Sequence, residues 1–222
     1  MPQSRTAIVV TGGAPPRASA LVGLPADAHV IAADSGLDNA LAVGLKPMLV
    51  VGDLDSVSPS ALAWARGMGI PIEEHPRGKD ATDTELALLA AIDSGASDVV
   101  MLSGGGDRLD HSMGALIALG NPFLAACSSV AARWADALIH VLHGPRAIEL
   151  TLPAGTTFSI LALHGPCVGV GERGTEWPLT NALVSPGSSL GISNVTVSPA
   201  VHIEVGTGVL TIIIPFQYGE SS

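Results

Sequence analysis

Two carboxylates stand one residue apart where an apolar run ends, in the segment VVGDLDS at residues 50–56. Side chains alternate along an extended chain, so Asp53 and Asp55 are expected to point the same way. Like charges this close repel unless a cation lies between them. Asp is also common in solvent-facing turns, where it bonds to nearby backbone amides. The place of the pair at the end of a buried strand supports a second interpretation, a Mg²⁺ site that also takes phosphate oxygens.

More charged residues follow in KDATDTE, at residues 79–85. Asp83 lies near an expected helix start, where it could simply complement the helix dipole. Asp80 could be an ordinary loop acid. Lys79, however, is one of only two lysines in the chain. Its place beside two acids indicates a phosphate contact as the alternative.

Glycines and an arginine meet in LSGGGDRLDH, at residues 102–111, between an expected strand and an expected helix. The glycines could form a loose turn, or they could let backbone N–H groups approach a phosphate as helix N-termini do. Arg108 would then add a charge-assisted contact. The spacings of a Walker A loop, a zinc site and a nucleophile elbow are all missing from the sequence. Asp34, in AADSG, also follows a strand and is a further candidate.

One aromatic residue stands apart in the second half of the chain. Trp177 lies in TEWPLTNALV, a polar, Pro-containing segment rather than an apolar strand. Such a residue either caps the core or offers a stacking wall for a flat or cationic ligand ring. The segment alone leaves both interpretations open.

The elements that must position these residues alternate up to about residue 143. The strand candidates are rich in Val, Ile and Leu and lack polar alternation, as expected for strands buried on both faces of a parallel sheet. They are TAIVVTGG, AHVIAADSG, PMLVVGDLDS, DVVMLSGGG and ALIHVLHG. Several end in Gly, Asp or Ser, and in open α/β sheets the ligand crevice lies beyond the carboxyl ends of the strands.

Helices are expected between these strands. In SVSPSALAWARGMG, Ser58 is a candidate N-cap and Pro59 takes the first helical position. TDTELALLAAIDSG opens with the capping-box pair Thr82 and Glu85. A further helix is expected from Asp110 to the stop at GNP.

The sequence changes character from Arg146 onward, within the segment HGPRA at residues 143–147. Short β-type runs are punctuated there by Gly, Pro and Ser, which is typical of an antiparallel sandwich or barrel. The runs are AIELTLPAG, TTFSILALHG, NALVSPGSS, SNVTVSPA, VHIEVGTG and VLTIIIP. The boundary between two domains is therefore expected in HGPRA.

Charge and composition narrow the classes of function. The formal net charge of −10 argues against a nucleic-acid partner. It permits a phosphate-bearing small molecule, because a metal ion or a few arginines can invert the field in one cleft. Cys127 and Cys167 are far apart and suit a reducing cytoplasm. No apolar run approaches the ~20 residues of a membrane helix, so we expect a cytoplasmic protein without a membrane partner.

The order of the motifs resembles the thiamine pyrophosphokinase family. AADSG, GDLDS, KDATDTELAL, GGGDRLDH, EWPLTN and GISN follow one another, and the resemblance runs from about Ile8 to Ile214. Ser35 departs from the family pattern, where Gly is common, and the Gly run before Arg108 is extended. The resemblance implies an α/β domain with an open, mostly parallel sheet and flanking helices at residues 1–143, which binds ATP and metal. It also implies an antiparallel β-sandwich at residues 144–222, which binds thiamine, and a homodimer with thiamine near the subunit boundary.

The resemblance further implies a reaction and a set of site residues. The reaction is a Mg²⁺-dependent transfer of the diphosphoryl group of ATP to the hydroxyl of thiamine, giving thiamine diphosphate and AMP. The expected metal ligands are Asp53, Asp55 and Asp83, and these three with Arg108 and Asp110 are the expected catalytic residues. The expected ATP contacts are Asp34, Lys79, Asp80, Gly105 and Arg108. The expected thiamine contacts are Trp177, Ser193, Asn194 and Asp110.

Two other functions stay open at this point. A metal-dependent D-x-D nucleotidyl- or glycosyltransferase would explain Asp53 and Asp55 but not the later D-x-T-D and R-x-D-H motifs in this order. A non-catalytic thiamine- or nucleotide-binding module would be expected to lose its carboxylates while keeping the pocket, whereas the acidic positions of all four motifs are present here.

Overall fold

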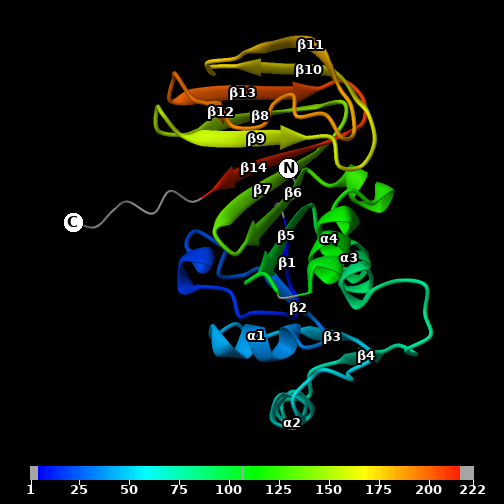
Figure 1. The fold of residues 1–222 in the computed structure, drawn as a ribbon. Coiled ribbons are helices and arrows are strands. Elements are labelled where there is room, and N and C mark those ends of the chain that lie inside the picture. Colours follow the sequence, from blue (N-terminus) through cyan, green and yellow to red (C-terminus); the bar gives the residue numbers. More distant parts are fainter. Residues whose placement is uncertain (1–4, 107, 216–222) are drawn as a thin grey trace. The chain divides into compact units, whose positions relative to one another are not determined.

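Apolar runs of Val, Ile and Ala form a parallel sheet in the first part of the chain (Figure 1). The computed structural model describes residues 5–106 and 108–215. They divide into two compact units, one up to Ala135 and one from Asp136. In the first unit the strand order is β6-β5-β1-β2-β3-β4. The strands are β1 (Thr6–Val10), β2 (His29–Ala33), β3 (Leu49–Gly52), β4 (Ile72–Glu74), β5 (Asp98–Ser103) and β6 (Ser129–Trp134).

Helices cover both faces of this sheet. Successive strand residues such as Ile8 and Val9, whose side chains point to opposite faces, are therefore both buried. Helices α1 and α2 pack on one face through Ala40, Ala61 and Ala65. Helix α3 packs on β1, β2 and β3, covers the opposite face and contacts α4. The helices are α1 (Gly36–Ala42), α2 (Pro59–Gly67), α3 (Asp83–Asp93) and α4 (Leu109–Ala118), with short 3-10 helices at Ala18–Leu21 and Pro122–Ala126. None of the described helices has the length and apolar character needed to cross a membrane.

Two predicted helix starts are confirmed by their hydrogen bonds. The Ser58 hydroxyl accepts a hydrogen bond from the backbone N–H of Ala61 (3.1 Å), and Pro59 follows as the first helical residue. The Thr82 hydroxyl accepts one from the N–H of Glu85 (3.2 Å). The Glu85 carboxylate accepts a hydrogen bond from the side-chain amide of Asn121 (2.9 Å), which links the start of α3 to the segment after α4.

The second unit contains two antiparallel sheets that enclose a common core. One sheet has the order β12-β9-β14-β7 and the other the order β11-β10-β13-β8. Phe158, Ile160, Ile203 and Ile212 are fully buried within the cluster of apolar residues that both sheets contribute. The strands are β7 (Ala137–His143), β8 (Arg146–Thr151), β9 (Thr157–Leu161), β10 (Cys167–Arg173), β11 (Leu179–Val184), β12 (Asn194–Val195), β13 (Ala200–Val205) and β14 (Val209–Pro215). The predicted fold class, a parallel α/β domain followed by an antiparallel sandwich, is confirmed.

The division between the units falls at Ala135/Asp136 rather than in the predicted segment 143–147. Strand β7, expected to end the α/β domain, instead pairs antiparallel with β14 from His143↔Val209 to Ala137↔Pro215. Its apolar pattern is equally compatible with a parallel strand, so only the pairing partner decides its place. Unlike β7, strands β4, β6 and β10 were not predicted as strands at all. Gly169 and Gly171 interrupt the apolar pattern of β10, and glycine is depleted in strands.

Candidate active site

The carboxyl ends of β1, β2, β3 and β5 form one edge of the parallel sheet. The chain passes from β1 to β2, β3 and β4 on one side and returns to β5 on the other side of β1. Such a reversal of strand order leaves a crevice at the strand ends. A cavity of about 650 Å³ lies there, and the loops after these four strands line it. The candidate residues of these loops therefore share one cavity, as the sequence predicts.

The floor of the cavity is formed by two glycine-containing loops in direct contact. The backbone N–H of Ala14 donates to the carbonyl of Gly105 (2.8 Å), and the N–H of Gly104 donates to the carbonyl of Ala14 (3.2 Å). A Cβ atom on Gly104 would lie 2.3 Å from the Ala14 oxygen. Asn39 of α1 is buried and donates its side-chain amide to the carbonyl of Thr11 (2.9 Å). The glycines thus serve the close approach of two loops rather than a loose turn.

Three carboxylates converge at the edge of the sheet. Asp34, Asp53 and Asp83 each offer an oxygen within 4.8 Å of the other two. Asp34 and Asp53 follow the neighbouring strands β2 and β3, and Asp83 is the first residue of α3. Gly52 has a φ of +152°, and a Cβ atom there would lie 3.1 Å from the Asp34 Cβ and 3.2 Å from the Asp83 Cγ. Glycine suits this position, because a side chain here would be strained and would press on both Asp34 and Asp83.

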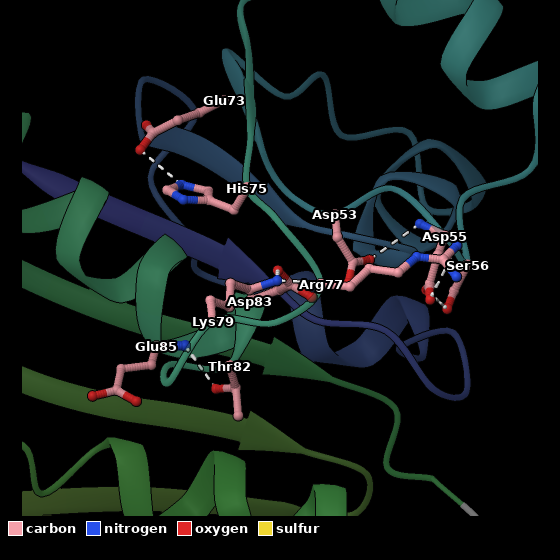
Figure 2. A network of polar contacts seen from close by, with 10 residues as sticks. All are labelled: Asp53, Asp55, Ser56, Glu73, His75, Arg77, Lys79, Thr82, Asp83 and Glu85. Carbon is pink, nitrogen blue, oxygen red and sulfur yellow. Dashed lines mark hydrogen bonds and ion pairs between the residues drawn. The ribbon is translucent and has the colours of Figure 1, made fainter.

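Asp55 points away from this cluster, contrary to the expected common direction of Asp53 and Asp55. The residue between them, Leu54, has a left-handed backbone with a φ of 62°, which breaks the alternation of an extended chain. The Asp55 carboxylate accepts a hydrogen bond from Ser56 (2.9 Å) and lies 3.5 Å from Arg77. Figure 2 shows Asp55 and Ser56 on the opposite side of Asp53 from Asp83. Asp55 still lines the cavity.

Lys79 supplies the positive charge nearest to the cluster (Figure 2). Its Nζ lies 2.8 Å from Asp83 Oδ1 and 3.6 Å from Asp53 Oδ2, and only 14% of its side chain is exposed. Burial acts to lower the pKa of Lys79, but its contacts with Asp83 and Asp53 outweigh that effect and raise the pKa. Lys79 is therefore a charged partner of two of the three carboxylates.

Burial and neighbouring charge shift the pKa values of Asp34 and Asp53 in opposite directions. Burial, together with the negative charges of Asp83 and Asp53, raises the pKa of Asp34. Burial also opposes ionisation of Asp53, but the hydrogen bond from the Asp55 N–H (3.2 Å) and the nearby Lys79 lower its pKa overall. A proton is therefore bound more readily at Asp34 than at Asp53.

The three carboxylates fit a small divalent cation. Hard oxygen ligands of this kind are those that Mg²⁺ takes in proteins, together with phosphate oxygens and water. Among the described residues, the buried Oδ1 of Asp34 has no hydrogen-bond partner. Buried polar atoms are rarely left unpaired, and this oxygen belongs to the cluster that could hold the cation.

The remaining predicted site residues of the first unit are divided between the cavity and the surface. Arg108 and Asp110 line the cavity, as does Gly105, whose N–H donates to the Ser103 hydroxyl (3.2 Å). Arg108 donates to Asp110 through Nε (3.2 Å) and a terminal nitrogen (2.5 Å), and this pairing lowers the pKa of Asp110 to about 2. Asp80 is exposed and does not line the cavity.

Sequence reasoning missed three residues that build this cavity. Arg77 and Trp134 line it, and Asn39 holds its floor. Trp134 ends β6, a strand that the sequence did not predict, and Asn39 is one polar residue within an otherwise ordinary helix pattern. The only signal for Arg77 was its place two residues before Lys79.

Three of the four predicted thiamine residues, Trp177, Ser193 and Asn194, lie in the second unit, whereas the fourth, Asp110, belongs to the first. Trp177 is 57% exposed, Ser193 is exposed and Asn194 is buried. The Asn194 side chain holds the backbone of Trp177, because its Oδ1 accepts from the Trp177 N–H (3.2 Å) and its Nδ2 donates to the Trp177 carbonyl (2.9 Å). An indole on a fixed backbone and open to solvent is suited to stack on a flat ring.

Family models match both parts of the chain. Residues 24–128 match the model described as "Thiamin pyrophosphokinase, catalytic domain". Residues 139–210 match the model described as "Thiamin pyrophosphokinase, vitamin B1 binding domain". The first match contains the carboxylate cluster, and the second contains Trp177 and Asn194.

Individual relatives agree with the family models. Thiamine pyrophosphokinase 3 from Oryza sativa subsp. japonica is 27% identical over 164 residues, which cover 68% of this chain and 58% of the rice protein. The crystal structure of thiamine pyrophosphokinase from Bacillus subtilis is similar in fold, with a TM-score of 0.79 and 20% identity over 96% of this chain and 100% of that one. The enzyme from Candida albicans matches with a TM-score of 0.77 and 14% identity, over 96% of this chain and 90% of that one.

Proposed function

Because this chain belongs to the thiamin pyrophosphokinase family, we propose that it transfers the diphosphoryl group of ATP to the hydroxyl of thiamine, giving thiamine diphosphate and AMP. The observation that carries the proposal is the cluster of Asp34, Asp53 and Asp83 beside Lys79. The cavity around it, of about 650 Å³, is within the usual range for a small-molecule site. Its lining includes carboxylates as well as the cationic side chains of Lys79 and Arg108, as a metal-bound polyphosphate requires.

In the proposed reaction, the hydroxyl oxygen of thiamine forms a bond to the β-phosphorus of ATP. The bond from that phosphorus to the oxygen bridging the α-phosphate breaks, so AMP leaves, and the proton of the hydroxyl is released to the solvent. Transfers of this kind depend on positioning and electrostatics more than on covalent help from the protein. The loops of the cavity, held to each other by backbone hydrogen bonds, are suited to positioning.

The proposed cofactor is Mg²⁺, held by Asp34, Asp53 and Asp83, with Asp55 at the edge of the set. When bound, Mg²⁺ would screen these carboxylates from one another and offset the charge on the phosphate oxygens. We assign Lys79 and Arg108 to the remaining phosphate charge, since both line the cavity. Asp80 and Gly105 complete the proposed ATP contacts, with Asp80 restricted to an outer one by its exposure.

Asp110 is assigned to orienting the hydroxyl rather than to taking its proton. With a pKa of about 2, it is ionised at neutral pH and is a weak base. Its pairing with Arg108 also keeps its carboxylate at the cavity wall. An alcohol attacking a metal-activated phosphate needs only weak proton acceptance in the transition state.

Thiamine is assigned to the exposed indole of Trp177 in the second unit. Stacking suits the flat, cationic rings of this substrate. The exposed Ser193 would supply a polar contact, and Asn194 would act through the Trp177 backbone that it holds. The proposal includes a homodimer, because the resemblance implies a thiamine site near a subunit boundary. It also includes the cytoplasm, since Cys127 and Cys167 lie far apart in the sequence, which suits a reducing compartment.

The product formed from ATP and thiamine tests this function. The purified protein is incubated with ATP, Mg²⁺ and thiamine, and AMP and ADP are separated by chromatography. Thiamine-dependent AMP with thiamine diphosphate is expected, and Asp53→Asn should lose this activity while keeping its circular dichroism spectrum. Absence of any reaction would favour the D-x-D transferases, and calorimetric binding of thiamine without turnover would favour a non-catalytic binding module.

A further inference from the structure

A carboxylic acid occupies a core position of the second unit. Strand β10 pairs with β13 so that Glu172 stands opposite Ile203 and Arg173 opposite His202. Residues directly opposite each other in a sheet share a face, and Ile203 belongs to the core. Glu172 accordingly points inward and is fully buried. Alternation along β10 would ordinarily place an apolar residue there.

The Glu172 carboxyl has few hydrogen-bond partners in that position. Its Oε2 accepts a hydrogen bond from the side-chain amide of Asn194 (3.3 Å), whereas its Oε1 has no partner among the described residues. Burying a carboxyl with so few partners is unfavourable, and burial raises the pKa of Glu172 to about 7. Nothing in the packing of the sandwich calls for an acid at this position, so a role beyond stability is indicated.

The side-chain amide of Asn194 has four hydrogen-bond partners, of which three are backbone groups and the fourth is the Glu172 carboxyl. Nδ2 faces Glu172 and the Trp177 carbonyl, and Oδ1 faces the N–H groups of Trp177 (3.2 Å) and Val195 (2.8 Å). The reversed amide would place its oxygen against two acceptors and its NH₂ against two donors. Glu172 therefore reinforces the orientation that the backbone contacts favour, in which Asn194 pairs with both backbone groups of Trp177.

We propose that Glu172 is a positioning residue for thiamine: it orients Asn194, which fixes the Trp177 backbone so that the exposed indole is held ready to stack on the ligand. This inference rests on the proposed function, because it assumes that Trp177 meets thiamine. The role belongs to the affinity for thiamine and not to that for ATP, whose proposed residues all lie in the first unit.

The deciding variant is Glu172→Leu, which removes the acceptor and puts an apolar side chain of similar size in its place. Replacing a buried, poorly paired charge by a packed apolar group is often neutral or stabilising, so the variant should fold at least as stably as the wild type. Calorimetry should show thiamine binding weakened about tenfold, the loss of about one hydrogen bond's contribution. ATP binding should change less than about twofold. Glu172→Gln, which keeps an acceptor, should restore most of the thiamine affinity.

Ile203→Val is the matched control, since Ile203 stands opposite Glu172 in the same core. It should lower the melting temperature and leave thiamine binding unchanged. Wild-type thiamine affinity in Glu172→Leu, or an equal loss in Ile203→Val, would overturn the positioning role. If Glu172→Leu does not fold, Glu172→Met takes its place. A wild-type protein that binds no thiamine would contradict the proposed function itself, so the two failures are distinguishable.

Discussion

The buried carboxyl of Glu172 should make the stability of the protein depend on pH. Burial, only partly opposed by the hydrogen bond from Asn194, raises the pKa of Glu172 from 4.5 to about 7. Below pH 4.5 the carboxyl is protonated in both the folded and the unfolded chain. Between pH 4.5 and 7 only the unfolded chain releases the proton, so the free energy of unfolding falls as the pH rises. Above pH 7 both states are ionised and the loss is complete.

The size of the effect follows from the same shift. One unit of pKa corresponds to about 1.4 kcal/mol, so a rise from 4.5 to about 7 amounts to about 3 kcal/mol. Glu172→Gln has no proton to release and should avoid this loss. Its free energy of unfolding, measured relative to that of the wild type, should therefore increase by about 3 kcal/mol from pH 4.5 to pH 8.

Urea unfolding followed by circular dichroism at half-unit steps from pH 4.5 to 8 measures this difference. Other titrating groups are shared by both proteins and cancel in the comparison. Glu176→Gln removes an exposed carboxyl of the same segment and is the control for a change of net charge. Wild-type and Glu172→Gln curves that run parallel across this pH range would refute the reasoning, because they would mean that Glu172 ionises equally in both states.

Three further outcomes follow from the two sites. Gly52→Ala should lower the free energy of unfolding by about 2 kcal/mol, measured in urea, because its Cβ would lie 3.1 Å from that of Asp34; AMP formation should fall with it. Lys79→Met should bind free Mn²⁺ more tightly by calorimetry and ATP more weakly, because in the wild type the Lys79 ammonium lies 2.8 Å from Asp83 and competes with a cation for this carboxylate. Weaker Mn²⁺ binding in the variant would contradict that competition. Trp177→Ala should weaken thiamine binding by at least about tenfold and ATP binding far less, and equal losses would return Trp177 to a core role.

Local signals in the sequence were sufficient for the elements that they control. Ser58 and Thr82 could be predicted as N-caps because each accepts its hydrogen bond from a residue three positions further on. The parallel sheet could be predicted because strands buried on both faces carry unbroken apolar runs. The place of β7 could not, since its partner β14 is more than sixty residues away in the sequence.

The carboxylate cluster shows where sequence reasoning stops. Spacing alone pairs Asp53 with Asp55, whereas the structure brings Asp53 beside Asp34. That meeting depends on the register of β2 with β3, in which Ala33 stands opposite Val51, and on the left-handed backbone of Leu54. Neither is visible in a motif of alternating acids. Glu172 was hidden for a similar reason, because only the pairing of β10 with β13 reveals that its side chain points inward.

The contact between the loops after β1 and β5 has a consequence for affinity. Hydrogen bonds between Ala14 and its partners Gly104 and Gly105 join these loops through the protein's own backbone, and Asn39 ties the first loop to α1. The conformational entropy of these segments is thus lost during folding and need not be lost again when a long, flexible polyphosphate arrives. A side chain at Gly104 would separate the loops and transfer that loss to each binding event, where it would appear as a higher dissociation constant for the nucleotide.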